Sequence, residues 1–282
     1  MMNVKFNLHT HTSYCDGSKD IEEMIKAAIN YNYQIIGISS HGPLPFESDW
    51  TMKKEDLHEY IEEVKKLKEK YKSDIKILLG LELDYIPGFK FDYIDNDIFK
   101  SLDYWIGSIH FLGQYKNKEY WTVDYDLKEL KRGIQETFGD NIKKAVIQYY
   151  KYMEDMVENY KPSILGHLDL IKKNNRNSIL FDESELWYRN SISSLLDKVK
   201  KSNVVVELNT GGKYRNYTNN YYPSNWILKE INSRDIPITI SRDSHDIESL
   251  DFEYEDSIKL LKTIGFSEIY YYDGKTWEKT YI

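Results

Sequence analysis

The chain has 282 residues, of which 41% are hydrophobic and 30% are charged. This balance is typical of a globular protein and argues against intrinsic disorder, because enough apolar surface is available to form a core. α/β barrels reach this length as single units, so we predict one domain that spans residues 1–282.

The net charge of −8 comes from 38 basic and 46 acidic residues. It argues against general nucleic-acid binding, which needs a basic surface, but not against a small phosphorylated substrate drawn to bound metal ions. Cys15 is the only cysteine, which excludes an intramolecular disulfide and a cysteine zinc site. Without a signal-like N-terminus or an apolar run near the roughly 18 residues of a membrane span, we expect a cytoplasmic protein that makes no membrane contact. The sequence leaves the oligomeric state open.

Short apolar runs alternate with longer amphipathic stretches, which is the pattern of repeated βα units. We predict strands at residues 4–8, 34–39, 76–83, 104–109, 163–166, 204–208 and 237–240, with a further strand at 268–271. Helices are expected at residues 20–31, 53–72, 127–138, 141–160, 183–202, 226–234 and 254–264. Loops at 174–177 and 209–220 follow predicted strands and are candidates for substrate contact. This order predicts an α/β fold of the barrel type.

The first two helices have clear amphipathic patterns. The helix at 20–31 begins with Asp20, a favourable N-cap residue, and places Ile21, Met24, Ile25 and Ala28 on one face. The helix at 53–72 has an apolar stripe under a heavily charged face that we assign to solvent.

Six of the seven histidines lie at or just beyond the C-terminal end of a predicted strand, namely His9, His11, His41, His110, His167 and His245. The seventh, His58, lies in the middle of a helix. Because the C-terminal ends of barrel strands meet on one face, these side chains are expected to share one pocket.

Two pairs with i, i+2 spacing strengthen this interpretation. His9 and His11 form H-x-H, and Asp243 and His245 form D-x-H, so each pair points to one side of its strand and suits a shared metal ion. Glu82 is a carboxylate in the apolar strand ILLGLELDY, where a bridging position between metal ions would offset the cost of its burial. Each signal alone has an ordinary alternative: a surface or core histidine, or a strand-end glutamate in water.

Asp16 and His41 follow the first two strands and are candidates to hold a further metal ion with His245. Asp16 precedes Gly17, so an ordinary turn residue is a nearly equal alternative for it.

In chain order, the segments H-T-H, S-H-G, G-L-E-x-D, G-S-I-H-F, G-H-x-D-L-I, E-L-N-T-G and D-S-H resemble those of the polymerase and histidinol phosphatase (PHP) phosphoesterases. The segments G-S-I-H-F-L, G-H-L-D-L-I-K-K and Y-P-S are most similar to the histidinol-phosphate phosphatase branch. The resemblance implies a distorted (β/α)7-type barrel with two or three divalent metal ions, zinc, manganese or iron. It assigns His9, His11, Glu82 and Asp243 to the first ion, Glu82, His110 and His167 to the second, and Asp16, His41 and His245 to the third.

Three basic residues near these segments need separate interpretations. The segment S-R-D-S-H places Arg242 where the family has a small residue, and strand alternation turns this side chain away from Asp243, which favours a structural role. Arg215, in T-G-G-K-Y-R-N, is a candidate for phosphate binding or an ordinary solvated arginine. Lys172 is a weaker candidate for the same role.

The resemblance implies hydrolysis of a phosphate monoester, with L-histidinol phosphate, from histidine biosynthesis, as the expected substrate. Metal ions would activate the attacking water, Asp243 and His245 are the expected catalytic residues, and Asp243 or a metal-bound water is the candidate proton donor. The alternatives are a nucleotide phosphodiesterase, a tyrosine-phosphate phosphatase, an amidohydrolase, or a metal-binding domain that has lost catalysis. Turnover on a substrate panel separates them.

Overall fold

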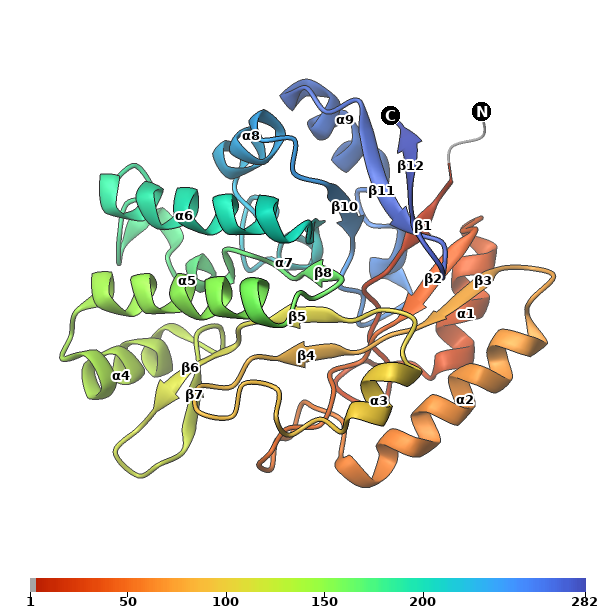
Figure 1. Cartoon of the computed structure of the whole chain (residues 1–282), viewed down its shortest axis with the longest axis horizontal. Helices are drawn as coiled ribbons and strands as arrows, with labels where there is room; N and C mark the ends of the chain where they lie inside the picture. The colour runs from red at the N-terminus through yellow and green to blue at the C-terminus, as the bar shows by residue number, and fades with distance from the viewer. Residues whose placement is uncertain (1–3) are drawn as a thin grey trace.

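A computed structural model describes residues 4–282. In Figure 1 the parallel strands occupy the middle of the molecule and the longer helices lie around them. The strands are β1 (Phe6–Asn7), β2 (Ile35–Ile38), β3 (Lys76–Leu79), β4 (Glu82–Asp84), β5 (Ile106–Ser108), β6 (Phe111–Gln114), β7 (Tyr120–Thr122), β8 (Ile164–Leu165), β9 (Val205–Asn209), β10 (Ile238–Ser241), β11 (Glu268–Tyr272) and β12 (Trp277–Tyr281). The helices are α1 (Ile21–Asn30), α2 (Leu57–Lys70), α3 (Asn96–Ser101), α4 (Leu127–Phe138), α5 (Ile142–Asn159), α6 (Leu186–Ser202), α7 (Gly211–Tyr214), α8 (Asn225–Ser233) and α9 (Tyr254–Ile264).

Two parallel sheets form the centre, with strand orders β1-β2-β3 and β10-β9-β8-β5-β4. They meet at two places: His41 bridges to Glu82 at the start of β4, and Thr10 bridges to Ser244 just beyond β1 and β10. The α/β class and the parallel strands are therefore confirmed. The two junctions favour a distorted barrel, although within residues 4–282 single bridges, rather than continuous ladders, join the sheets.

The strand predicted at 76–83 is divided, because β3 pairs with β2 whereas β4 pairs with β5. Tyr104 lies at this division, where its hydroxyl donates to the carbonyl of Leu8. A Cβ atom on Gly80 would lie 2.5 Å from the Tyr104 ring, and one on Gly37 would lie 2.1 Å from its hydroxyl. Glycine at both positions makes room for an aromatic side chain that spans the junction of the two sheets.

The long helices lie close to their predicted positions. Asp20 caps α1 as predicted: its side chain accepts from the Glu23 amide at 2.7 Å, and the Glu23 side chain accepts from the Asp20 amide at 3.1 Å. The predicted apolar residues of α1 are all buried. The predicted helix at 53–72 begins as a 3₁₀ turn at Lys54–Asp56 before α2, and the helix predicted from residue 183 begins at Leu186.

Several short elements were not predicted. The hairpin of β6 and β7 is antiparallel, and its register shifts between Phe111 and Gly113, which interrupts the strict alternation that would have marked it. β12 pairs antiparallel with β11, and α3 and α7 have six and four residues, too few for a helical period to be visible.

Arg242 has the structural position that its strand phase predicted. It is fully buried, its Nη1 donates to the carbonyl of Phe6 at 3.3 Å, and its guanidinium lies 4.1 Å from the centre of the Tyr254 ring. Its backbone amide donates to Asn7 Oδ1 at 3.0 Å. The departure from the family pattern thus joins β10 to β1 and α9 without entering the metal cluster.

We expect Arg242→Ala to lower the free energy of unfolding by about 3 kcal/mol, because it empties a buried volume and removes the contact to Phe6. Arg242→Met should lose less than half as much, since it keeps the apolar stem that packs against Tyr254. Equilibrium urea unfolding of both variants measures the difference. Equal losses below about 1 kcal/mol would contradict this structural role.

Candidate metal centre

Nine candidate ligands come together at the C-terminal edge of the central strands. His9 and His11 follow β1, His41 follows β2, His110 follows β5, His167 follows β8, and Asp243 and His245 follow β10. Glu82 opens β4, and Asp16 lies in the turn before α1. All are buried except Asp16, which is exposed, and His245, which is partly buried. The predicted convergence on one pocket is thus the arrangement observed.

Glu82 lies at the centre of the cluster and is 1% exposed. Its Oε2 is 3.0 Å from His9 Nε2, 3.3 Å from His11 Nε2 and 3.1 Å from His41 Nδ1. Its Oε1 is 3.0 Å from His167 Nε2 and 4.0 Å from His110 Nε2. One carboxylate therefore faces five imidazoles with both of its oxygens, which is the arrangement expected of a bridging ligand.

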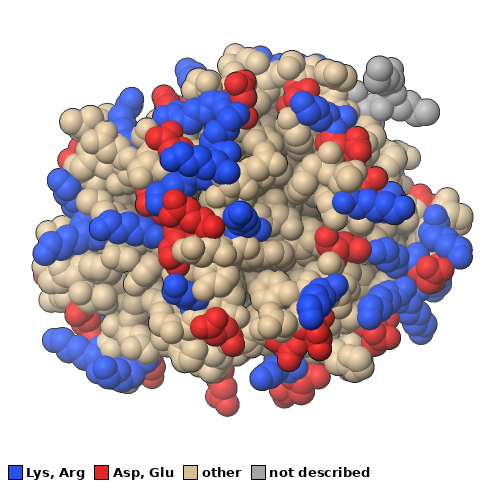
Figure 2. All heavy atoms as spheres, in the orientation of Figure 1, with Lys and Arg blue, Asp and Glu red and all other residues tan. Residues whose placement is uncertain are grey.

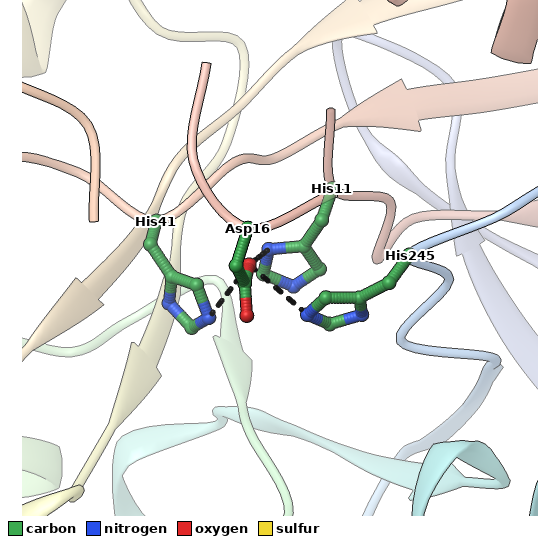
Figure 3. A group of neighbouring side chains, drawn as sticks. All are labelled: His11, Asp16, His41 and His245. Atoms are coloured by element: carbon green, nitrogen blue, oxygen red, sulfur yellow. Dashed lines mark ion pairs between the residues drawn. The ribbon is translucent and has the colours of Figure 1, made fainter. Parts of the chain in front are cut away.

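The side chains fall into groups whose ligand atoms lie within 4.8 Å of one another: His11 with Asp16, His41 and His245; His9 with His11 and Asp243; His41 with Asp84 and His110; and Glu82 with His110 and His167. Figure 3 shows the first group, in which three imidazoles point toward the Asp16 carboxylate. Asp16 Oδ1 is 3.2 Å from His245 Nε2, 3.8 Å from His11 Nδ1 and 3.9 Å from His41 Nε2. Three of these four groups overlap with the ligand sets that the family resemblance implied, although the group of His9 lacks Glu82 and the group of Asp16 adds His11. The fourth group, of His41, Asp84 and His110, corresponds to none of the implied sets.

The donor atoms fit divalent metal ions. Within the described chain, His11 Nε2, His41 Nδ1 and His167 Nδ1 are buried without a hydrogen-bond partner. Because an unpaired buried nitrogen is costly, the two that face Glu82, on His11 and His41, are suited to a cation. Imidazole and carboxylate together suit zinc, manganese or iron and do not choose among them.

Two carboxylates behind the cluster orient the histidines, and the sequence had not singled them out. Asp84 Oδ1 accepts from His110 Nδ1 at 2.7 Å, so His110 Nε2 faces Glu82. Glu207 accepts from His9 Nδ1 at 2.9 Å and from the His167 amide at 2.7 Å. The side-chain amide of Asn209 and the hydroxyl of Ser241 also donate to Glu207. The available signal was an acidic residue inside two apolar strands, in G-L-E-x-D and E-L-N-T.

Glu207→Gln is expected to weaken metal binding by about 10-fold to 100-fold, because the partner that holds His9 Nδ1 protonated and turns Nε2 inward is lost. Competition with a chromogenic chelator measures the change. Glutamine keeps the side-chain size and one oxygen acceptor, so the fold should remain. A variant with lower stability but unchanged metal affinity would make Glu207 a purely structural residue.

The pKa values of the side chains in the cluster shift in different directions. Burial lowers the pKa of His9 and His110, but nearby carboxylates outweigh it and raise both to about 10. For His41 burial dominates and the pKa falls to about 3. Burial opposes ionisation of Glu82 and Asp243, yet the adjacent histidines, together with Arg215 for Asp243, hold both pKa values well below their usual range. Both carboxylates are therefore ionised at neutral pH and available as ligands.

Asp243 divides its carboxylate between the cluster and Arg215. Its Oδ1 is 3.2 Å from His11 Nε2, and its Oδ2 accepts from Arg215 Nη2 at 2.8 Å. Asp243 has φ of 50°, a left-handed backbone that aspartate adopts more readily than most residues. This turn aims Asp243 and His245 at the same pocket.

Lys172 does not have the predicted position. Its Nζ is 2.6 Å from Asp169 Oδ2 and donates to Ser224 Oγ at 2.6 Å, and it does not line the cavity in front of the cluster. Asp169 and Lys172 lie three residues apart around a 3₁₀ turn at Leu170–Lys172, so their side chains share a side. The neighbouring Lys173 lines the cavity instead.

A cavity of about 540 Å³ opens in front of the cluster. Seven of the nine candidate ligands line it, all except His9 and His11, which lie deeper. Its wall also includes Asp49, Trp50, Asp124, Lys173, Arg215 and Tyr217. The predicted loop at 209–220 contributes to this wall and contains α7, whereas the loop at 174–177 does not line it. Acidic and basic side chains are intermixed over the face shown in Figure 2.

A model of the PHP domain matches residues 7–211, well over half of the chain. The chain belongs to the PHP family. It is 28% identical over 264 residues to the histidinol-phosphatase of Bacillus subtilis (strain 168), which covers 88% of this chain and 96% of that protein. The crystal structure of hisK from Listeria monocytogenes matches with a TM-score of 0.80 at 26% identity, covering 89% of this chain and 99% of that one.

A histidinol phosphate phosphatase from Lactococcus lactis, complexed with zinc, L-histidinol and phosphate, has the same fold with a TM-score of 0.74. It is 23% identical and covers 97% of this chain and 98% of its own. The resemblance to the PHP family and its histidinol-phosphatase branch is thereby confirmed. Separately, none of the helices in residues 4–282 is both long and apolar enough to cross a membrane.

Proposed function

We propose that the protein is a metal-dependent phosphatase that hydrolyses L-histidinol phosphate to L-histidinol and phosphate. The observation that carries this proposal is the convergence of nine candidate metal ligands, seven of which line a cavity whose wall also holds Arg215 and Lys173. The histidinol-phosphatases that match most of the chain support the choice of substrate. A place in histidine biosynthesis follows from that substrate.

The residues would hold two or three divalent ions. The proposed first set is His9, His11, Glu82 and Asp243, the second is Glu82, His110 and His167, and the third is Asp16, His41 and His245. Zinc is the first candidate because the Lactococcus structure contains it, and manganese and iron remain open. Such ions lower the pKa of water toward neutrality and offset the charge that develops on a phosphoryl group.

Arg215 is placed to bind the phosphate. It lines the cavity, its Nη2 and Nη1 lie beside Asp243 and His245, and its buried Nε has no partner among residues 4–282. A planar guanidinium suits two phosphate oxygens at once. Lys173 adds a second positive charge, although Asp124 Oδ2 accepts from its Nζ at 3.2 Å.

Asp243 and His245 act as metal ligands beside the phosphate and not as proton donors. The lowered pKa of Asp243 leaves it without a proton at neutral pH, which favours water as the donor to the leaving alkoxide. His245 Nδ1 lies 2.9 Å from the Asp243 carbonyl, a contact that directs Nε2 toward Asp16.

The test is phosphate release from L-histidinol phosphate by protein loaded with manganese or zinc, beside a nucleotide diester and phosphotyrosine. We expect turnover of the histidinol ester by the unmodified protein. A His9→Ala, His11→Ala variant should lose this turnover, and Arg215→Ala should have a higher KM. Preference for the diester or for phosphotyrosine would move the protein to another activity of the family. Bound metal without turnover of any ester would indicate a domain that has lost catalysis.

A further inference from the structure

The cavity in front of the metal cluster has two chemically different sides. Arg215 contacts the side formed by Asp243 and His245. Trp50 contacts the opposite pair of ligands: its ring centre lies 4.7 Å from that of His41 and 5.4 Å from that of His110, edge to face in both cases. A substrate whose phosphate lies toward Arg215 would therefore extend its organic part toward Trp50.

The position of Trp50 is fixed from behind. Its ring stacks on Phe111, with 5.8 Å between ring centres and 20° between planes. Phe111 begins β6, so the indole rests on a strand although it belongs to the loop between β2 and α2. This packing gives the cavity a rigid aromatic wall directly beside the metal ligands.

Asp49, adjacent to Trp50, adds a negative charge to this wall. The cavity holds two other charged side chains outside the cluster and Arg215, and these neutralise each other, since Lys173 Nζ is 3.2 Å from Asp124 Oδ2. Asp49 is exposed, and among residues 4–282 it has no ion pair and its side chain has no hydrogen bond. The outer part of the cavity therefore has one uncompensated carboxylate beside an aromatic ring.

We propose that Asp49 and Trp50 form a subsite for a positively charged organic group on the substrate, and so select the leaving alcohol. The subsite rests on the proposed function, because L-histidinol phosphate carries a basic imidazole at the end remote from the phosphate and an ammonium on the carbon that precedes the ester CH2. A carboxylate accepts charge-assisted hydrogen bonds from an ammonium, and an indole attracts a cation or stacks with imidazole. The arrangement would disfavour esters with neutral or anionic alcohols.

The test is calorimetric binding of L-histidinol, in the presence of saturating phosphate, to the metal-loaded protein and to Asp49→Asn. We expect the Kd for L-histidinol to rise about tenfold in the variant, with phosphate affinity unchanged. Glu47→Gln is the matched control, because this substitution removes the same charge from the same loop. Glu47 is exposed and lines a neighbouring cavity instead of this one. This control should bind L-histidinol as the unmodified protein does.

Three results of the binding experiment would overturn the subsite. Equal weakening of L-histidinol and phosphate in Asp49→Asn would mean that the loop is structural, and an equal effect of Glu47→Gln would mean a general field of charge. No binding of L-histidinol to the unmodified protein would remove the subsite altogether. Turnover of L-histidinol phosphate is measured separately. Binding of L-histidinol without turnover of the ester would reject the proposed function and leave the subsite, whereas turnover of the ester with an unchanged KM in Asp49→Asn would support the proposed function and reject the subsite.

Discussion

Glu82→Gln is expected to lower kcat for the phosphate ester by about a thousandfold or more, equivalent to about 4 kcal/mol of activation free energy. Both Glu82 oxygens face imidazole nitrogens, with four of the five contacts between 3.0 and 3.3 Å. Glutamine fills the same volume but lacks the charge and presents an NH₂ group to one side of the cluster. It can no longer bridge two cations, so we also expect fewer metal ions per chain.

The measurements are kcat and metal content by elemental analysis, with Glu183→Gln as the matched control. Glu183 is partly buried, whereas Glu82 is fully buried, and it too has side-chain donors: Trp226 Nε1 and Ser224 Oγ both donate to it at 2.7 Å. It takes no part in the cluster. The control should keep its metal ions and its activity. Glu82→Gln protein that retains full metal content and more than a tenth of the activity would show that Glu82 is no bridging ligand.

The position of the cluster was predictable because it depends on strand direction alone. Parallel strands end on one edge, so His9, His110 and His167 could be brought together from three short apolar runs without knowledge of the strand order. The pairing of those strands was a different matter. The division of residues 76–83 into β3 and β4 depends on Tyr104 packing against Gly80, a contact between distant segments.

The residues around the cluster were harder to predict, because their roles depend on the direction of each side chain and on contacts with distant segments. Lys172 and Lys173 differ by one residue in a 3₁₀ turn, and that difference decides which of them reaches the cavity. Glu207 resembles a ligand in sequence, yet its oxygens accept from His9 Nδ1 and the His167 amide, behind the cluster. Asp49 and Trp50 lie outside regular structure, where no periodicity indicates the direction of a side chain.

Metal binding is expected to release about three protons per chain near neutral pH and to strengthen by up to about a thousandfold per pH unit between pH 7 and 9. The reason is the raised pKa of three histidines before metal binds: the pKa of His9 and of His110 is about 10, and, against the effect of burial, Asp243, Cys15 and Glu82 hold the pKa of His11 well above its usual range. A histidine with a pKa above the solution pH holds a proton that its metal-ligating form must lose. His41, with a pKa of about 3, is already neutral and contributes none.

The direction of this pH dependence follows because a metal ion binds the neutral form of a histidine, whereas a protonated histidine cannot bind it. Protons compete with metal ions as long as these histidines are protonated, so a higher pH favours the metal, and the dependence should flatten once all three histidines are neutral. Manganese titrations at pH 7 and 8, in buffers of different ionisation enthalpy, give the number of protons released. Asp84→Asn is the informative control, because the Asp84 carboxylate raises the pKa of His110 and its loss should reduce the release by about one proton, to about two. A binding enthalpy independent of the buffer would show that the histidines are already neutral before the metal ion binds. The carboxylates around them would then not raise the pKa of these histidines above neutral pH.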